Sequence, residues 1–164
     1  MERLQADFLL NHRYRMSHKI ARGGMGEVWE AFDTVLDRSV AVKVLHPHTA
    51  AEKAFVERFR DEAKLAARLR SPHIVEVYDY GEDSSLAFLV MELVRGTTVA
   101  NQLEADGVIS PARTTEILLD IADALATAHE ADVIHRDVKP SNILLSDDGR
   151  GALLADFGIA RALT

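Results

Sequence analysis

The sequence of 164 residues predicts an α+β fold of two lobes. In its first half, short runs of alternating or continuous apolar residues predict a small, mostly antiparallel sheet accompanied by one helix. Near Gly96 the composition changes, and the remaining residues predict mainly helices, with only two short strands. The segment that follows Met91 is therefore expected to join the two lobes.

The first lobe begins with two predicted strands and a helix. Residues 27–33 alternate between the two faces of a strand, and a turn at Asp37 separates them from a second strand at 39–45. Residues 50–70 are rich in Ala, Glu, Lys and Arg, which favour a helix, and Pro72 is expected to end it. These segments supply one half of the predicted sheet and its single helix.

A hairpin completes the predicted sheet. Residues 73–83 and 86–94 both have the composition of strands, and the polar residues 82–85 between them predict a turn. The first lobe is therefore expected to be complete as a small sheet with one helix.

Two helices are predicted in the second lobe. The first lies near 98–105 and is closed by Gly107. Ser110 followed by Pro111 is a favourable helix start, and this second helix is expected to run to about Ala131.

The longer of these helices is unusually apolar. Within residues 117–128 the polar side chains are Asp120, Asp123 and Thr127, which form one narrow stripe. A helix that is apolar around the rest of its circumference is expected to be buried on most sides. Little sequence follows it to provide that cover, which suggests that part of the domain is missing.

Composition excludes several classes of function. The net charge is −7 with no basic cluster, so nucleic acid is not an expected partner. The absence of cysteine excludes disulfides and thiolate metal sites and fits a reducing cytoplasm. No apolar stretch approaches the roughly 20 residues needed to span a bilayer, and the N-terminus does not have the pattern of a secretory signal. A soluble, cytoplasmic protein is expected, and the sequence does not indicate its oligomeric state.

The glycine-rich segment 21–28 is the first candidate site. Gly23, Gly24 and Gly26 lie between strand-like segments, where free backbone N–H groups can cradle a phosphate. Taken alone, the pattern favours a hairpin turn without a ligand. A strand follows the glycines where a dinucleotide-binding motif requires a helix, and no Gly-Lys-Ser/Thr of a P-loop occurs.

Lys43 and Glu62 form a second candidate pair. Lys43 lies in a strand that is apolar on both faces, so it either extends to solvent from a sheet edge or has a partner. Glu62 lies in the middle of the apolar stripe of the helix at 50–70, where a buried carboxylate needs a partner. The two side chains are therefore candidates to pair, although Glu62 at the margin of the stripe would instead contact solvent.

Residues 133–145 hold the densest group of ionisable side chains. His135, Arg136, Asp137 and Lys139 stand with Asn142 between two apolar runs. A solvated turn is the simplest interpretation, but apolar anchors at both ends suit a preorganised site.

An acidic residue ends the last predicted strand. Strands are expected at 142–145 and 152–156, joined by a turn at 147–149, so that Asp156 would face Asn142 across the pair. A carboxylate and an amide oxygen are ligands suited to Mg²⁺, with phosphate completing its shell.

Five motifs, taken in their order along the chain, strongly resemble the protein-kinase signature. They are the glycine-rich loop, "VAVK", the helix glutamate, "HRDVKPSN" and "DFG". The likeness is to the bacterial eukaryotic-like (Hanks-type) Ser/Thr protein kinases and extends from about Tyr14 to the end of the chain. It implies a bilobal protein-kinase fold with a complete N-lobe of antiparallel sheet plus one helix and only the first part of a mainly helical C-lobe. The implied domains are an N-terminal extension at 1–13, an N-lobe at about 14–91, a hinge at 92–96 and a partial C-lobe at 97–164.

The resemblance also implies an ATP pocket. Its residues would be Ile20, Ala21, Arg22, Gly23, Gly24, Met25, Gly26, Glu27, Val28, Ala41, Lys43, Met91, Glu92, Val94 and Leu144. Residues 20–28 would cover the phosphates, although Ala21 stands where the family has its first glycine. Met91 would lie at the back of the adenine pocket, beside the hinge backbone.

The implied chemistry is phosphoryl transfer from ATP to Ser/Thr hydroxyls of protein substrates. Asp137 would be the catalytic base and Lys139 would neutralise the γ-phosphate. Lys43, oriented by Glu62, would hold the α- and β-phosphates, and the catalytic set would comprise Asp137, Lys139, Lys43 and Glu62. Asn142 and Asp156 would ligate Mg²⁺.

The A-P-E motif of the family and the segment leading to it are absent from this sequence. A kinase chain truncated in its activation segment is therefore expected, with weak or undetectable transfer and a tendency to aggregate. The alternative is a non-catalytic fragment that binds nucleotide or a partner. The sequence retains all five polar site residues of the family, which favours the kinase; they are Lys43, Glu62, Asp137, Asn142 and Asp156.

Overall fold

The fold was analysed in a computed structural model that describes residues 4–22, 26–45 and 50–157, without the side chains of residues 22, 50–53 and 62. The chain divides into two compact units. Unit 1 comprises Met1–Ala63 and Val77–Leu93, and unit 2 comprises Lys64–Glu76 and Val94–Thr164. Among the described helices, none combines the length and apolar character needed to cross a membrane.

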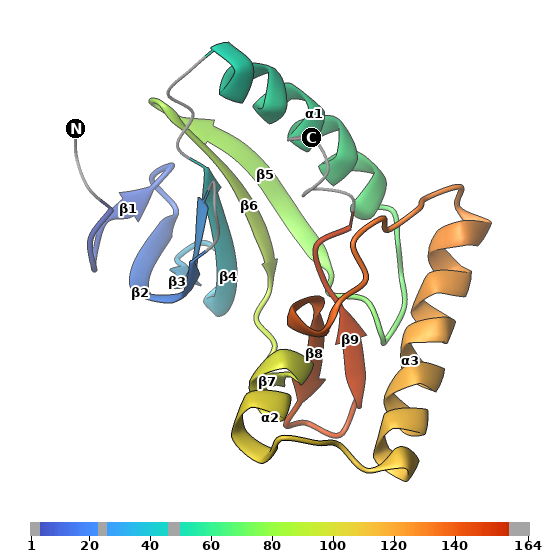
Figure 1. Cartoon of the computed structure of the whole chain (residues 1–164). Coiled ribbons are helices and arrows are strands. Elements are labelled where there is room, and N and C mark those ends of the chain that lie inside the picture. The colour runs from blue at the N-terminus through green and yellow to red at the C-terminus, as the bar shows by residue number, and fades with distance from the viewer. Residues whose placement is uncertain (1–3, 23–25, 46–49, 158–164) are drawn as a thin grey trace. The chain divides into compact units, whose positions relative to one another are not determined.

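Unit 1 is built around a curled antiparallel sheet (Figure 1). Its strands lie in the order β1-β2-β3-β4-β6-β5, and every neighbouring pair is antiparallel. The bounds are β1 Leu9–Leu10, β2 Tyr14–Arg22, β3 Gly26–Asp33, β4 Arg38–Leu45, β5 Val77–Asp83 and β6 Leu86–Glu92. The antiparallel sheet predicted for the first half of the sequence is therefore confirmed.

One helix, α1 (Ala50–Ala66), accompanies this sheet. Phe55 and Phe59 are buried on it, and the Phe59 ring lies 5.8 Å from the Tyr80 ring of β5. The predicted helix extended to residue 70, which is four residues too far. Residues 67–68 form a turn instead, in which Leu69 N–H bonds the carbonyl of Ala66 in the tighter i→i−3 pattern.

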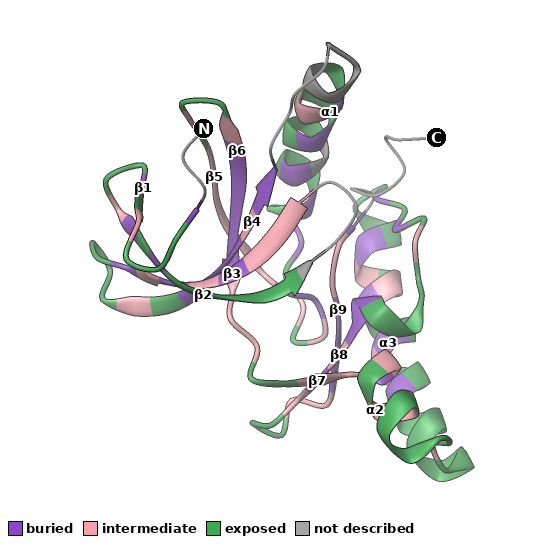
Figure 2. Ribbon diagram, turned by 60° about the vertical axis from the view of Figure 1, so that its left-hand side comes forward, coloured by how far each residue is buried: buried purple, intermediate pink, exposed green. Residues whose placement is uncertain are grey.

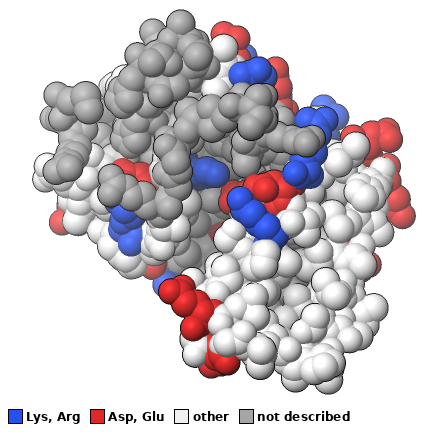
Figure 3. Space-filling model, in the orientation of Figure 1, with Lys and Arg blue, Asp and Glu red and all other residues white. Residues whose placement is uncertain are grey.

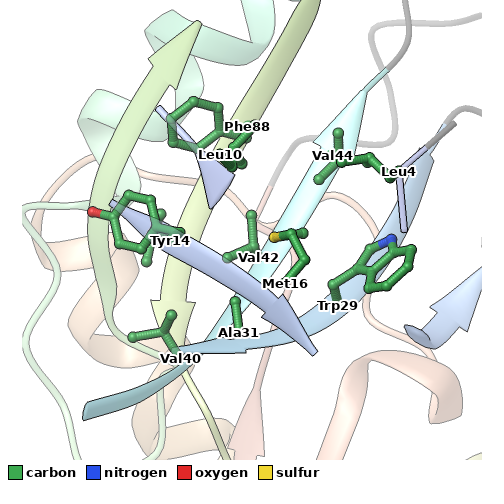
Figure 4. Close-up of a cluster of buried hydrophobic side chains, with 11 residues drawn as sticks. Leu4, Leu10, Tyr14, Met16, Trp29, Ala31, Val40, Val42, Val44 and Phe88 are labelled. Carbon is green, nitrogen blue, oxygen red and sulfur yellow. The ribbon is translucent and has the colours of Figure 1, made fainter. Parts of the chain in front are cut away.

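One cluster of core residues in unit 1 lies on one face of the sheet (Figure 4). Alternate residues of β4 and β6 point into it, which is the strand period that the sequence shows. The cluster consists of Leu4, Leu10, Tyr14, Met16, Trp29, Ala31, Val40, Val42, Val44, Phe88 and Val90. Buried residues also follow one another along β4 and β6 (Figure 2), so both faces of these interior strands are covered.

Described residues before Tyr14 contribute to the core and to the sheet of unit 1. Leu4 and Leu10 lie in the core, and the β1 residues pair with the start of β2. The sequence partition into an extension at 1–13 and a domain from residue 14 remains a prediction, but residues 9–10 contribute the outermost strand.

An ion pair between the half-buried Arg13 and the buried Asp33 fixes the start of β2 to the end of β3. Arg13 donates two hydrogen bonds to Asp33, from Nε to Oδ1 at 2.9 Å and from a terminal nitrogen to Oδ2 at 2.8 Å. Asp33 is 1% exposed and also accepts the N–H groups of Val35 and Leu36. The Arg13 hydrogen bond is the largest cause that lowers the pKa of Asp33 from 3.8 to about 2, against the opposing effect of burial.

We expect Asp33 to make folding acid-sensitive. Its folded pKa lies below its unfolded value, so its stabilising contribution is complete above about pH 4 and is lost as the pH falls through about 2. The difference corresponds to about 2 kcal/mol of unfolding free energy. Urea unfolding between about pH 6 and pH 2 should show this loss, and Asp33→Asn should remove that component. An unchanged pH slope in Asp33→Asn would contradict the assignment.

Unit 2 contains two helices and a small second sheet (Figure 1). The helices are α2 (Val99–Asp106) and α3 (Pro111–Glu130), and the sheet is antiparallel in the order β7-β8-β9. The strands are β7 Gly96–Thr98, β8 Ile143–Ser146 and β9 Ala152–Leu154, and a 3₁₀ turn, η1, covers Pro140–Asn142.

The predicted ends of the two helices are confirmed. Gly107, at φ +79°, closes α2, and its N–H bonds the carbonyl of Leu103. Ser110 caps α3 by accepting the N–H of Arg113, with proline at the first turn.

Several predicted strand boundaries are wrong. β9 ends at Leu154 instead of 156, β6 ends at Glu92 instead of 94, and the strand predicted from residue 73 begins only at Val77. Residues 73–75 instead bond β9, as described below. Asn142 was predicted in a strand but lies in η1, where its N–H bonds the carbonyl of Lys139.

The α3 helix is buried along one stripe. Its buried residues are Ile117, Ile121, Ala124 and Ala128, whereas Leu118 and Leu119 are 57% and 66% exposed. In Figure 3 the surface at the lower right, where α3 lies in Figure 1, is mostly free of charged side chains. The apolar circumference noted in the sequence is therefore only partly covered by the described residues.

Candidate functional site

The segment between α3 and β8 is a loop that is anchored at both ends. Val133 and Ile143 are buried, and the polar residues predicted to form a site lie between them. Arg136 has a left-handed backbone, with φ at +70°, and Pro140 starts η1. These local constraints fix the path of the loop within unit 2.

His135 is the centre of this loop. It is 1% exposed, its Nε2 lies 2.6 Å from the carbonyl oxygen of Ala155, and its Nδ1 lies 3.1 Å from the backbone N–H of Asp137. A carbonyl can only accept and an N–H can only donate, so these contacts require the neutral tautomer with hydrogen on Nε2. The ring also packs edge-on against Phe157 at 4.6 Å. One buried side chain thus joins the loop to the segment after β9.

Asp137 is held by two neighbours in the same loop. Asn142 donates from Nδ2 to both the backbone carbonyl of Asp137, at 2.8 Å, and its Oδ2, at 3.1 Å. Lys139 Nζ lies 3.2 Å from the same Oδ2. The Asp137 carboxylate is 26% exposed, so it is oriented by the protein and still accessible. Such a carboxylate is suited to accept a proton from a bound hydroxyl.

Asn142 and Asp156 are brought close together by backbone bonding. The N–H of Ala155 donates to the carbonyl of Asn142 at 2.9 Å, and Asp156 follows directly with a left-handed φ of +58°. The Asn142 amide uses its nitrogen on Asp137, which leaves its oxygen as an acceptor. A carboxylate and an amide oxygen are hard donors that fit Mg²⁺. Among the described residues, no group of three or more His, Asp or Glu side chains is placed to hold a metal, so a cation here would need further oxygen ligands from a bound phosphate.

In unit 1, Lys43 occupies an interior strand. β4 lies between β3 and β6, and Lys43 is opposite Val28 on one side and Leu89 on the other. The interpretation of Lys43 as a lysine at a sheet edge is therefore wrong. Glu62 lies in α1, but its side chain is outside those described, so its pairing with Lys43 stays a prediction.

The predicted phosphate loop is only partly described. Gly23, Gly24 and Met25 lie outside the described residues, while the backbone of Arg22 in β2 is opposite that of Glu27 in β3. A Cβ at Gly26 would collide with the carbonyl oxygen of Val44, so this position requires glycine. Ile20 and Ala21 precede the gap as exposed residues of β2.

The residues predicted around adenine are placed separately in the two units. In unit 1, Ala41 and Met91 are both buried and face each other across β4 and β6, and Glu92 ends β6. Val94 and Leu144 belong to unit 2, where Leu144 lies in β8. Their roles toward a nucleotide stay predictions.

Two polar residues beside β9 were not recognised as part of a site from the sequence. His73 and Asp120 both bond the backbone of Ala152. Asp120 was noted only as part of the polar stripe of the long helix. In the structure Gly151 lies beside Asp120 with a left-handed φ of +83°, and a Cβ added at this position would collide with the Asp120 carboxylate.

Comparisons with known proteins agree on one family. The family model described as "Protein kinase domain" matches residues 14–164. The chain is 46% identical over 157 residues to the probable serine/threonine-protein kinase pknA2 of Bifidobacterium longum, covering 94% of this chain and 21% of that protein. It is 46% identical over 155 residues to the serine/threonine-protein kinase PknL of Mycobacterium tuberculosis, covering 94% of this chain and 39% of that protein. The chain thus spans well under half of the length of these relatives.

Solved structures agree with this match. The crystal structure of the Mycobacterium tuberculosis PknI kinase domain superposes with a TM-score of 0.85 at 34% identity. The match covers 97% of this chain and 63% of that one.

Proposed function

The chain belongs to the protein kinase domain family, and from this premise we propose that it carries the nucleotide and metal site of an ATP- and Mg²⁺-dependent protein serine/threonine kinase. The observation that best supports the proposal is the bonding of Asp137. A carboxylate that is held by an amide and an ammonium group, yet remains accessible, is arranged for proton transfer.

Asp137 would act as the base of the reaction. It would accept the proton of a substrate serine or threonine hydroxyl as that oxygen bonds the γ-phosphorus and the bond from phosphorus to the ADP oxygen breaks. Asn142 would keep the carboxylate pointed toward the hydroxyl through its bond to Oδ2. Lys139, which already contacts this carboxylate, would neutralise charge on the transferred phosphoryl group.

Asn142 and Asp156 would hold Mg²⁺ through their oxygens. A bound Mg²⁺ supplies charge neutralisation and orientation for the phosphate oxygens. His135 would support both ligands indirectly, because it bonds Ala155 and Asp137 at once. Arg136, which is exposed beside Asp137, would be free to pair with a phosphorylated residue of an activation segment.

The nucleotide would be bound by the remaining predicted residues. Lys43 would contact the α- and β-phosphates, with Glu62 as its partner, and residues 20–28 would cover the phosphates. Met91 would lie at the back of the adenine pocket, with hydrogen bonds to the backbone of Glu92 and Val94. Ala41 and Leu144 would pack on the two faces of the adenine ring.

Calorimetry with Mg·ATP tests the binding part of this proposal. We expect the wild-type chain to bind and Lys43→Ala to weaken binding about ten- to a hundredfold, because a charge-assisted contact to phosphate is lost. Lys64→Ala, which removes an exposed lysine of α1, serves as the matched control and should bind as wild type does. Equal affinities of Lys43→Ala and wild type would contradict the role of Lys43. Absence of binding by the wild-type chain would contradict the proposed nucleotide site.

A further inference from the structure

The outer edge of β9 is completely covered. β9 is the last strand of its sheet, and all three of its residues are fully buried. A buried strand edge needs a partner for each of its free N–H and C=O groups. In unit 2 these partners come from two places far away in the sequence, residues 73–75 and Asp120 of α3.

Residues 73–75 supply backbone and side-chain bonds. Leu154 N–H donates to the carbonyl of His73 at 2.8 Å, and Val75 N–H donates to the carbonyl of Leu154 at 3.0 Å. The His73 ring lies with Nδ1 2.9 Å from the carbonyl oxygen of Ala152, so Nδ1 carries the hydrogen. Both ends of β9 are thereby fixed to this segment.

Asp120 completes the edge from α3. Its Oδ2 accepts the N–H of Ala152 at 3.0 Å, and its Oδ1 lies 3.6 Å from His73 Nε2. His73 and Asp120 therefore bond the carbonyl and the N–H of the same residue and also face each other. Gly151 is required beside them because any larger side chain would displace the carboxylate.

The contacts of His73 and Asp120 with β9 lie a few residues before Asp156, the predicted metal ligand. After Leu154, Ala155 is held by Asn142 and His135, and Asp156 follows. Residues 152–156 thus have one set of contacts at their start, from His73 and Asp120, and another at their end. A shift at Ala152 would be passed along this short extended segment to Asp156.

We propose that His73 and Asp120 are positioning residues that set the place of Asp156 relative to Asn142 by fixing β9. The inference rests on the proposed function, because it assigns Asp156 as a Mg²⁺ ligand. Removing a residue that holds a metal ligand in place typically lowers the metal affinity about ten- to a hundredfold.

The test compares disruptive and conservative variants of both residues. His73→Ala and Asp120→Ala remove the contacts to Ala152. In His73→Asn the amide nitrogen can take the place of Nδ1 and keep the bond to Ala152, and in Asp120→Asn the amide oxygen can still accept its N–H. Asp123→Ala, an exposed aspartate one turn along α3, is the matched control.

The first measurement is ATP affinity by calorimetry, with Mg²⁺ and with a chelator in its place. We expect the wild-type affinity to rise with Mg²⁺, and this gain to fall about tenfold in His73→Ala and Asp120→Ala. The affinity for metal-free ATP should be unchanged, and both asparagine variants should recover most of the gain. If the folded alanine variants gain as much ATP affinity from Mg²⁺ as wild type does, the inference is overturned. It is also overturned if the asparagine variants lose as much of this gain as the alanine variants do.

The second measurement is amide hydrogen exchange of the ligand-free chain by NMR, which does not depend on nucleotide. We expect the alanine variants to exchange about tenfold faster at Ala152, Leu154 and Ala155. Faster exchange at Ala152 alone would show that the disturbance does not reach Asp156, which overturns the inference. If the wild-type chain binds no ATP, the proposed function fails, and exchange at Ala155 still decides whether His73 and Asp120 fix this segment.

Discussion

Replacing Asp137 by alanine is expected to reduce phosphoryl transfer about a hundred- to ten-thousandfold, the range for loss of a general acid or base. Asp137 is oriented by Asn142 and Lys139 while its carboxylate stays 26% exposed and accessible. Binding of Mg·ATP should be nearly unchanged, because Asp137 is assigned to the acceptor hydroxyl and not to the nucleotide. Transfer of radiolabelled phosphate to a generic Ser/Thr protein measures the first effect, and calorimetry measures the second.

Transfer by the wild-type chain that is lost in Asp137→Ala would favour the kinase over its non-catalytic alternative. Asp123→Ala makes the same substitution at an exposed position of α3 and should behave as wild type. Transfer by Asp137→Ala at the wild-type rate would contradict the assignment of the base. A wild-type chain that binds Mg·ATP but transfers no phosphate would agree with the weak or undetectable transfer expected of a truncated kinase, and it would not distinguish that kinase from a non-catalytic nucleotide-binding fragment.

Local sequence patterns predicted most of the secondary structure because the signals are themselves local. Alternation of apolar residues located β3, and Ser110 and Gly107 determine their helix ends through bonds within a few residues. Some errors come from local i→i−3 turns, as at the end of α1 and at Asn142, and others occur where distant residues compete for the backbone. Residues 73–75 have the composition of a strand but bond β9 before the chain enters β5.

The candidate site was predictable to the extent that it lies in one continuous segment. The sequence placed Asn142 and Asp156 across neighbouring strands, and the bond from Ala155 to the carbonyl of Asn142 agrees with that proximity. The burial of His135 could not be derived, because it depends on Phe157 and Ala155 approaching from beyond β9. Asp120 was assigned by helix periodicity to a polar stripe, and periodicity does not show that a backbone N–H lies opposite.

Replacing Arg13 by alanine is expected to destabilise the fold by about 2 kcal/mol at neutral pH, because the interaction that lowers the pKa of Asp33 to about 2 is lost. In wild type Asp33 is 1% exposed and Arg13 is 30% exposed. The substitution would leave Asp33 with the N–H groups of Val35 and Leu36 but without its counter-charge. Arg113→Ala breaks an exposed pair with Glu116 and should cost less than about 1 kcal/mol. Urea unfolding of the two variants measures both values.

The pH dependence identifies the cause of the Arg13 effect. In wild type, Arg13 keeps the pKa of Asp33 near 2, so Asp33 stays ionised well into acid. Burial raises the pKa of Asp33, and Arg13 is the main group that opposes this effect. In Arg13→Ala, Asp33 should therefore take up a proton at higher pH and lose its charge. The difference in unfolding free energy between wild type and Arg13→Ala should therefore shrink as the pH falls from about 6 to about 2. A difference that stays constant over this range would instead assign the loss to packing, since the Arg13 guanidinium also lies 5.0 Å from the centre of the Tyr14 ring.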